Sequence, residues 1–339
     1  MNFIPDRNRE VRMKFQMLCK TCVAAVLALA LIGTEARAQS ADFTDWLKGL
    51  RAEALTKGVS TKTLDSALTG LKPIPRIVEL DRQQPEFTLT FQQYLSRVVP
   101  KSRIAKGKRK FNENRALLTE IGKKYAVQPR FIVAFWGIET DFGHHFGGFS
   151  VVASLATLAF DGRRSKFFRS ELLRALRILE QGHISPRRMK GSWAGAMGNF
   201  QFMPSSFETF AVDYDGDGKR DIWTNKGDAF ASAANYLSKS GWRSDQTWGR
   251  AVKLPLNMDK SLLGLKVRKT VNEWQKLGVR RLDGRDLPKR NLNASIVIVK
   301  GSGGAAFMVY KNFRVTLKWN RSIYFAVAVG ILAEGIGRS

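Results

Sequence analysis

The chain has 339 residues, enough to bury a hydrophobic core, and its 56 Lys and Arg residues outnumber its 29 Asp and Glu residues. The resulting formal net charge of +27 predicts an anionic partner. Both cysteines, Cys19 and Cys22, lie near the N-terminus, so the remainder of the chain has no disulfide, no thiolate nucleophile and no cysteine ligand for a metal.

The first 38 residues have the order of features that is typical of a secretory signal peptide. Basic side chains precede an apolar stretch over residues 23–32, which is too short to span a bilayer, and a small-residue triplet follows at 36–38. We expect cleavage after Ala38, export to the periplasm, and no lipid anchor, because neither cysteine lies at the cleavage point. The alternatives are a first helix of a cytosolic protein and a true start at Met13.

Charge and export together narrow the class of partner. Without the leader the chain keeps 50 basic and 26 acidic residues, scattered rather than in blocks. In an exported protein we expect these charges to meet the carboxylate-bearing peptides of the cell wall, or an anionic wall or membrane surface, and we expect no nucleic acid partner. A basic composition common to the whole proteome is the alternative explanation.

Periodicity and breaks divide the chain into regions. The expected divisions are a signal peptide at 1–38, an N-terminal helical region at 39–110, a mainly helical core at 111–242, a small β-containing subdomain at 243–310 and a C-terminal segment at 311–339 that packs back on the core. We therefore expect a mostly α fold of the α+β class.

Local patterns refine this division. Helices are expected over 43–71 with a break at Gly58, over 91–98, and over 324–336. Residues 101–110 read as a basic linker. Strands are expected at 295–299 and 306–310.

The segment from Pro129 to Gly143 carries an isolated carboxyl group. Pro129 suits the first turn of a helix and Gly143 its end, which places Glu139 in the last turn, with Phe135 and Trp136 one turn earlier on the same face. Desolvation by these rings and the negative end of the helix dipole would raise the pKa of Glu139, as a general acid near neutral pH requires. A surface glutamate at a helix end is an equally good interpretation from spacing alone.

Residues 191–206 alternate small residues and glycines with large apolar and amide side chains. This pattern suits a backbone that passes close beneath a ligand, with Ser192, Asn199 and Gln201 offering polar contacts. Without further information, a tightly packed turn between helices is the simpler interpretation.

Residues 213–221 resemble the first half of an EF-hand calcium loop. The side chains of Asp213, Asp215 and Asp217 and the carbonyl of Lys219 occupy alternate positions, with Gly at the sixth. The twelfth position is Thr, so we expect Asp228 to supply the later carboxylate. An Asp/Gly-rich turn without metal is the alternative. The sequence has no two histidines at i,i+4 spacing, no nucleophile elbow and no nucleotide-binding loop.

Several segments together resemble the membrane-bound lytic murein transglycosylase B family, from about residue 43 to the C-terminus. They are Gly137-Ile138-Glu139, residues 155–159, 191–198 and 201–206, Asp215-Gly216-Asp217-Gly218, residues 234–237 and 319–322. The resemblance implies a lysozyme-like fold, a calcium loop and no organic cofactor. The family's name implies a lipid anchor, and because this leader lacks the cysteine, a soluble periplasmic monomer is expected.

The resemblance also implies a reaction on the glycan strands of peptidoglycan. A single Glu, here Glu139, would protonate the bond between N-acetylmuramic acid and N-acetylglucosamine and then act as base, giving a 1,6-anhydro end without water, with assistance from the substrate's N-acetyl group. Asp141 points away along the helix and is expected to be structural.

By motif match, Ser192 and Gln201 would line the saccharide groove, and Tyr236 and Asn320 would contact sugar or orient Glu139. Trp319 stands where the family more often has Tyr. It could stack on a sugar, but any hydrogen bond made by a Tyr hydroxyl would be lost. The rival functions are a lysozyme-type muramidase that uses water and a non-catalytic peptidoglycan-binding protein.

Overall fold

The computed structural model describes residues 42–83, 89–299 and 304–338. The chain forms two compact units, Met1–Pro73 and Ile74–Ser339. The signal peptide expected at 1–38 lies outside the described residues. Within the residues that are described, no helix combines the length and the apolar character needed to cross a membrane.

The described part of the first unit, residues 42–73, contains two helices. Residues 42–56 form one helix and α2 (Thr61–Leu68) the other, and Leu50, Ala54 and Leu64 are fully buried. Between the helices Gly58 adopts a φ of 83°, a conformation that glycine reaches without strain. The helices expected over 43–71, with their break at Gly58, are confirmed.

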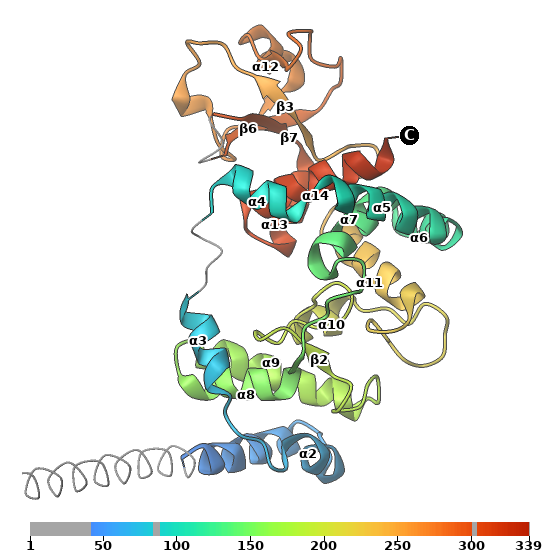
Figure 1. The fold of residues 1–339 in the computed structure, drawn as a ribbon, viewed down its shortest axis with the longest axis vertical. Helices are drawn as coiled ribbons and strands as arrows, with labels where there is room; N and C mark the ends of the chain where they lie inside the picture. Colours follow the sequence, from blue (N-terminus) through green and yellow to red (C-terminus); the bar gives the residue numbers. More distant parts are fainter. Residues whose placement is uncertain (1–41, 84–88, 300–303, 339) are drawn as a thin grey trace, which may run out of the picture. The chain divides into compact units, whose positions relative to one another are not determined.

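The second unit is built mainly from helices (Figure 1). They are α3 (Pro75–Gln83), α4 (Phe91–Val98), α5 (Lys101–Glu113), α6 (Arg115–Tyr125), α7 (Pro129–Thr140), α8 (Val151–Asp161), α9 (Ser165–Glu180), α10 (Pro204–Phe210), α11 (Lys226–Lys239), α12 (Val271–Lys276), α13 (Lys311–Trp319) and α14 (Ile323–Gly337), with the 3₁₀ turn η2 (Lys260–Leu262).

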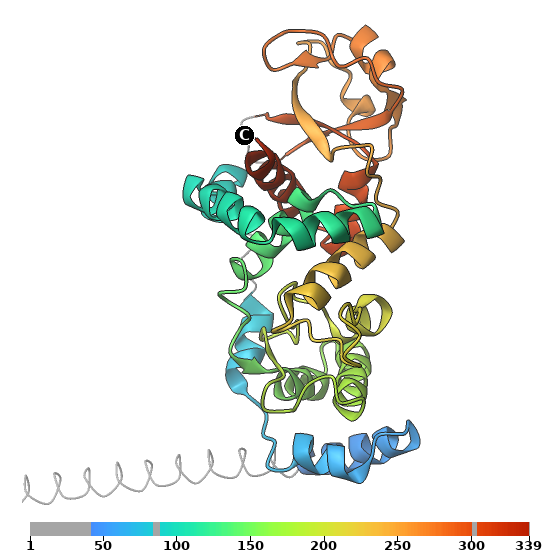
Figure 2. The ribbon, with the colours of Figure 1, turned by 90° about the vertical axis from the view of Figure 1, so that its right-hand side faces the viewer.

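Helix α14 packs against several other helices of this unit. It is apolar on nearly every side, as expected of a helix surrounded by protein. It packs against α4, α5, α7 and α13, and Figure 2 shows it in dark red beside α5 and α7. Gly330 lets the ring of Trp248 approach so closely that a Cβ there would lie 2.2 Å from it. The expected C-terminal helix is confirmed, and it packs on α7.

Residues 101–110 were expected to be a basic linker, and this prediction is wrong: they belong to helix α5. Lys and Arg are good helix formers, and Ile104 and Gly107 turn inward against α14. A Cβ on Gly107 would lie 2.7 Å from Ile336. The many charged residues hid the helix, because only a few residues form the apolar face of α5.

Five strands form an antiparallel sheet in the order β4-β6-β7-β3-β5. The strands are β3 (Gly249–Lys253), β4 (Lys269–Thr270), β5 (Arg280–Arg281), β6 (Asn293–Ile298) and β7 (Ala306–Val309). The two strands expected at 295–299 and 306–310 are confirmed as β6 and β7. Beneath them, Trp274 of α12 is fully buried and donates its indole N–H to the carbonyl of Ala294 at 3.1 Å.

A second ladder joins β1 (Phe149–Ser150) to β2 (Lys190–Gly191), with Phe149 opposite Gly191. It brings the start of α8 to the start of the glycine-rich segment at 191–206. A Cβ on Gly147 would lie 2.1 Å from the carbonyl oxygen of Gly191, so the two backbones meet where only glycine fits.

The surroundings of two helical glycines, Gly330 on α14 and Gly49 in the first unit, predict opposite effects of an added methyl group. Gly330→Ala should lower the free energy of unfolding by about 1–3 kcal/mol, because the new methyl group overlaps Trp248. Gly49→Ala, where a Cβ meets nothing within 4 Å, should raise it by about 0.5–1 kcal/mol. Urea denaturation of both variants checks this, and equal effects would contradict the packing described for α14.

Candidate active site

Glu139 lies in the last turn of α7, as the sequence predicts, and is partly buried. The helix ends abruptly because Asp141 and Phe142 adopt left-handed φ angles of 50° and 61°. Two non-glycine residues in this region mark a backbone under constraint at a helix end. The constraint fixes where the chain leaves the helix, two residues beyond Glu139.

Trp319, the last residue of α13, donates its indole N–H to Oε1 of Glu139 at 2.8 Å. At this position, where a Tyr hydroxyl would be absent, the indole of Trp319 supplies a hydrogen-bond donor instead. Indole N–H is a donor only. Because Oε1 accepts the hydrogen bond from the indole, a proton on the carboxyl group of Glu139 would be carried by the other oxygen, Oε2.

An aromatic cluster surrounds Trp319 and limits its movement. Its ring centroid lies 4.6 Å from Phe135, 4.6 Å from Tyr236 and 5.4 Å from Phe202. Phe135 precedes Glu139 by one turn of α7, so the same face of the helix holds the carboxyl group and the ring that supports its partner. These contacts fix the indole rather than leaving it open to rotate.

Asp141 is the nearest acid in sequence, but its side chain is occupied elsewhere. Lys106 lies 2.6 Å and Arg103 3.5 Å from its carboxylate oxygens. Burial would raise the pKa of Asp141, but these two cations outweigh it and hold the pKa below its ordinary value. The side chain is an ion-pair partner of α5, in agreement with its expected structural role.

The segment at 191–206 folds back on itself through two backbone bridges. Gly191 pairs with Met197, and Met197 pairs with Phe202. The hydroxyl of Ser192 accepts from the N–H of Ala196 at 3.1 Å, which closes the turn between the bridges. The structure gives Ser192 this local role, and it places Phe202 against Trp319, beside Glu139.

Gln201 adopts a left-handed φ of 49° between Phe200 and Phe202. Its amide nitrogen donates to the carbonyls of Phe146 and Gly198, each at 3.1 Å. Its amide oxygen has no hydrogen bond to a described residue and can accept one from a ligand. The strained backbone thus presents an oriented acceptor next to the aromatic cluster.

Asn199 joins α7 to both neighbouring loops, a role that the sequence did not reveal. Its Oδ1 accepts from the indole of Trp136 at 2.8 Å, and its Nδ2 donates to the carbonyls of Ile222 and Trp223. The hydroxyl of Thr140 donates to the Asn199 carbonyl at 2.8 Å. With a side chain only 5% exposed, this amide is fully hydrogen-bonded in the core.

Gly143, expected at the helix end, allows the chain to pass close to the side chain of Asn199. Its φ is 80°, and a Cβ there would lie 2.8 Å from Oδ1 of Asn199. A side chain at this position would compete with the Trp136 hydrogen bond.

Tyr236 packs against the ring of Trp319, and Asn320 follows Trp319 in the chain. The Tyr236 hydroxyl donates to the carbonyl of Lys318 at 2.9 Å, and burial raises the pKa of this phenol. Asn320 accepts from the N–H of Ser322 at 2.9 Å and lines a cavity of about 630 Å³ with Tyr94 and Tyr324. Neither residue has a hydrogen bond to Glu139 in the structure; that contact comes from Trp319.

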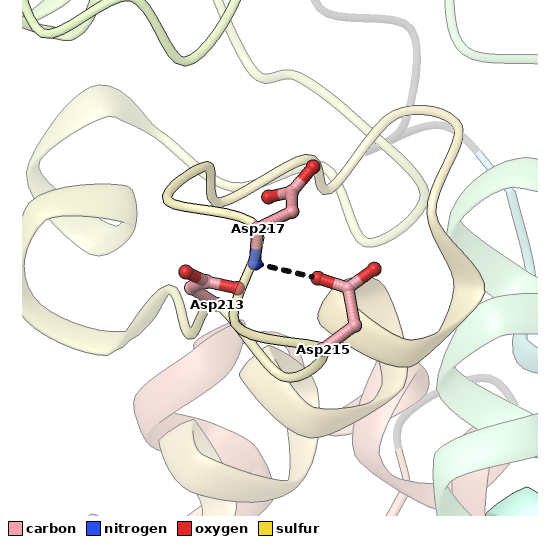
Figure 3. A group of neighbouring side chains, drawn as sticks. All are labelled: Asp213, Asp215 and Asp217. Carbon is pink, nitrogen blue, oxygen red and sulfur yellow. Dashed lines mark hydrogen bonds between the residues drawn. The ribbon is translucent and has the colours of Figure 1, made fainter.

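The three aspartates of the loop at 213–221 lie together (Figure 3), with one oxygen of each within 4.8 Å of the others. Asp213 accepts from the N–H groups of Gly216 and Gly218, each at 2.8 Å. Burial would raise the pKa of Asp213, but these backbone donors lower it below its ordinary value. Three converging carboxylates are the donor set that a hard cation prefers.

Asp228, on the first turn of α11, is fully buried and closes the loop from below. Its Oδ1 accepts from the N–H of Tyr214 and its Oδ2 from that of Asp221, both at 2.7 Å. Burial, together with the charges of Asp215 and Asp213, raises its pKa. Asp228 is not in the group of three, and its oxygens would reach an ion only through their remaining lone pairs.

The second unit is mostly helical, and Glu139 lies at the end of one of its helices. Both features agree with the lysozyme-like fold expected from the sequence. Comparison with protein families matches residues 42–334 to the Transglycosylase SLT domain, and the chain belongs to this family.

Solved and curated relatives agree. SltB3 from Pseudomonas aeruginosa, in complex with NAG-NAM-pentapeptide, is 44% identical, with a TM-score of 0.85 over 88% of this chain and 80% of that one. Slt35 from Escherichia coli, in complex with calcium, is 26% identical, with a TM-score of 0.73 over 88% and 93%. Membrane-bound lytic murein transglycosylase B of E. coli K12 is 28% identical over 82% and 79%. The mostly α, lysozyme-like fold and the family resemblance are confirmed.

Asn199→Ala should lower the free energy of unfolding by about 3 kcal/mol, because it leaves the Trp136 N–H and the Trp223 carbonyl without partners in the core, while the Ile222 carbonyl keeps its bond from the backbone N–H of residue 199. Asn272→Ala, at an exposed position of α12, is the matched control and should have little effect. Thermal or urea unfolding measures both; equal stability of the two variants would contradict the role of Asn199.

Proposed function

We propose that the protein is a periplasmic lytic transglycosylase that cleaves the β-1,4 bond between N-acetylmuramic acid and N-acetylglucosamine in peptidoglycan. The observation that carries the proposal is the hydrogen bond from Trp319 to Glu139, which orients a single carboxyl group in a partly buried site. Membership of the family and the muropeptide bound by the relative SltB3 support the substrate.

Glu139 first acts as acid. Its proton passes to the glycosidic oxygen as the bond from that oxygen to C1 of N-acetylmuramic acid breaks, and the acetamido oxygen of the same sugar bonds to C1 in its place. A second protein carboxylate is not needed for this step. The pairing of Asp141 with Lys106 is consistent with a one-carboxylate mechanism.

Glu139 then acts as base. As a carboxylate it takes the proton of the C6 hydroxyl, whose oxygen displaces the acetamido oxygen from C1 and closes a 1,6-anhydro ring. No water is consumed, and Glu139 ends protonated as it began. Gln201, with its amide oxygen available, and Ser192, Tyr236 and Asn320 would contact the sugars along the groove.

The calcium loop has a structural role in this proposal. Asp213, Asp215 and Asp217, the carbonyl of Lys219 and Asp228 would hold one Ca²⁺, and the convergence of three carboxylates fits such an ion. A bound ion would offset their mutual repulsion. The loop continues into Ile222 and Trp223, whose carbonyls accept hydrogen bonds from Asn199. An ordered loop would therefore stabilise the position of Asn199, which contacts the helix that carries Glu139.

Glu139→Gln should lower kcat on purified peptidoglycan by about 10²- to 10⁴-fold, because the amide cannot transfer a proton. Asp141→Asn is the control carboxyl change and should keep most of the activity. The released fragments are identified by mass spectrometry, with 1,6-anhydro ends expected from the unsubstituted protein. Full activity of Glu139→Gln would refute the assignment, and reducing ends would indicate a muramidase.

Trp319→Phe keeps an aromatic ring but removes the indole N–H that donates to Oε1 of Glu139. Because the donor positions the carboxyl group, kcat should fall about 10- to 100-fold with little change in KM. Trp319→Tyr, which restores a donor on a ring, should recover part of the loss. A rise in KM at constant kcat would instead assign Trp319 to substrate binding.

Calcium should raise the unfolding temperature, since an ion that binds only the folded state adds about 2.7 kcal/mol at a hundredfold excess over Kd. The double variant Asp215→Asn/Asp217→Asn should lose this increase. Differential scanning calorimetry with and without a chelator measures both. No difference in a protein first shown to be metal-loaded would remove the structural role of calcium.

A further inference from the structure

A second cavity, of about 440 Å³, lies between α13, the edge of the sheet and the end of α11. Four cationic side chains line it, with the amides of Asn291 and Asn293 beside them. The cations are Arg268, Lys311, Arg314 and Lys318. No carboxylate of the described chain lines this cavity, so its walls are positive and hydrogen-bond donating.

The four cations have no carboxylate partner among the described residues. Arg314 donates through Nη2 to the carbonyl of Leu265 at 2.6 Å and the hydroxyl of Ser295 at 2.7 Å. Lys318 donates to the carbonyl of Ser240 at 2.8 Å. Arg268 and Lys311 have no hydrogen bond to a described residue, so both remain available to a ligand.

Arg314 is held in place while its neighbour Arg268 repels it. Burial, and then the positive charge of Arg268, lowers the pKa of the Arg314 guanidinium. Two like charges kept close without a carboxylate partner repel each other, and an anion bound between them would relieve that repulsion.

The cavity lies along α13, the helix that also carries Trp319. Lys311, Arg314, Val315 and Lys318 follow one another at the spacing of one helical face, and all four line the cavity. Trp319, one turn beyond Val315, ends this face at Glu139. From Lys311 to Trp319 the helix rises about 12 Å.

We infer that this cavity, the stem pocket, binds a carboxylate of the peptide stem of the same peptidoglycan strand whose glycan lies at Glu139. The inference rests on the proposed function. An extended pentapeptide reaches about 17 Å, so a stem attached to a sugar beside Trp319 spans the distance to Arg268 and Lys311. A stem that is not cross-linked ends in a carboxylate, which guanidinium and ammonium groups bind through charge-assisted hydrogen bonds.

The stem pocket would therefore favour peptide-bearing over bare glycan. It gives part of the strong positive charge of the chain a specific ligand, and it places the stem along α13, on the side of the sheet. Because two of the four cations are anchored by backbone carbonyls or a hydroxyl, the pocket is largely pre-organised for the anion.

The test uses the protein carrying Glu139→Gln, so that ligand binds without turnover, and NAG-NAM-pentapeptide as probe. A second form of the probe has its stem carboxylates converted to amides. The double variant Arg268→Gln/Lys311→Gln is compared with Lys101→Gln/Arg109→Gln, which removes an arginine and a lysine from exposed positions of α5. Calorimetric Kd values and unfolding temperatures are measured for all three proteins.

We expect the stem-pocket variant to bind the acid form about fivefold more weakly and the amide form unchanged, with no change for the α5 variant. Equal loss for both forms, or none, while the parent protein binds normally, would overturn the stem pocket and leave the proposed function intact. If the parent protein bound neither form of the probe, the stem pocket and the proposed function would both be refuted.

Discussion

The side chain of Asn199 is the buried contact on which the rest of the site depends. It accepts from Trp136 on α7 and donates to the carbonyls of Ile222 and Trp223, which directly follow the aspartate-rich loop at 213–221. Because a buried amide that loses a partner is costly, the helix end that carries Glu139 and the loop that would carry the ion are set together. Folding of the loop and geometry of the carboxyl group are therefore linked through one residue.

On the opposite side, Trp319 completes the site from the C-terminal part of the chain. Its indole reaches Glu139 from α13, and Phe135, Phe202 and Tyr236 hold the ring. A Tyr hydroxyl can both donate and accept, whereas an indole only donates. Trp319 thereby restricts the carboxyl group to one arrangement in which Oε1 accepts. The same helix connects this contact to the stem pocket, so glycan and stem would be recognised along one element.

Much of this could be predicted from the sequence where the information is local. Proline and glycine positions placed Glu139 in the last turn of α7, alternating aspartates placed the loop at 213–221, and apolar runs located β6, β7 and α14. Non-local information was missing. The partner of Glu139 is 180 positions away, the role of Asn199 depends on three separate segments, and strands of two residues leave no periodicity to read. Helix α5 was mistaken for a linker because its buried face is narrow.

In the proposed reaction Glu139, held by Trp319, moves a proton between groups of the substrate, and the C6 oxygen of the sugar, not water, bonds to C1. Digestion of peptidoglycan in water enriched in the heavy oxygen isotope distinguishes the two acceptors, with mass spectrometry of the fragments taken early in the reaction. We expect 1,6-anhydro ends that carry no heavy oxygen, because the C6 oxygen closes the ring. Incorporation of one heavy oxygen atom at each new reducing end would refute the proposed reaction and show that water is the acceptor.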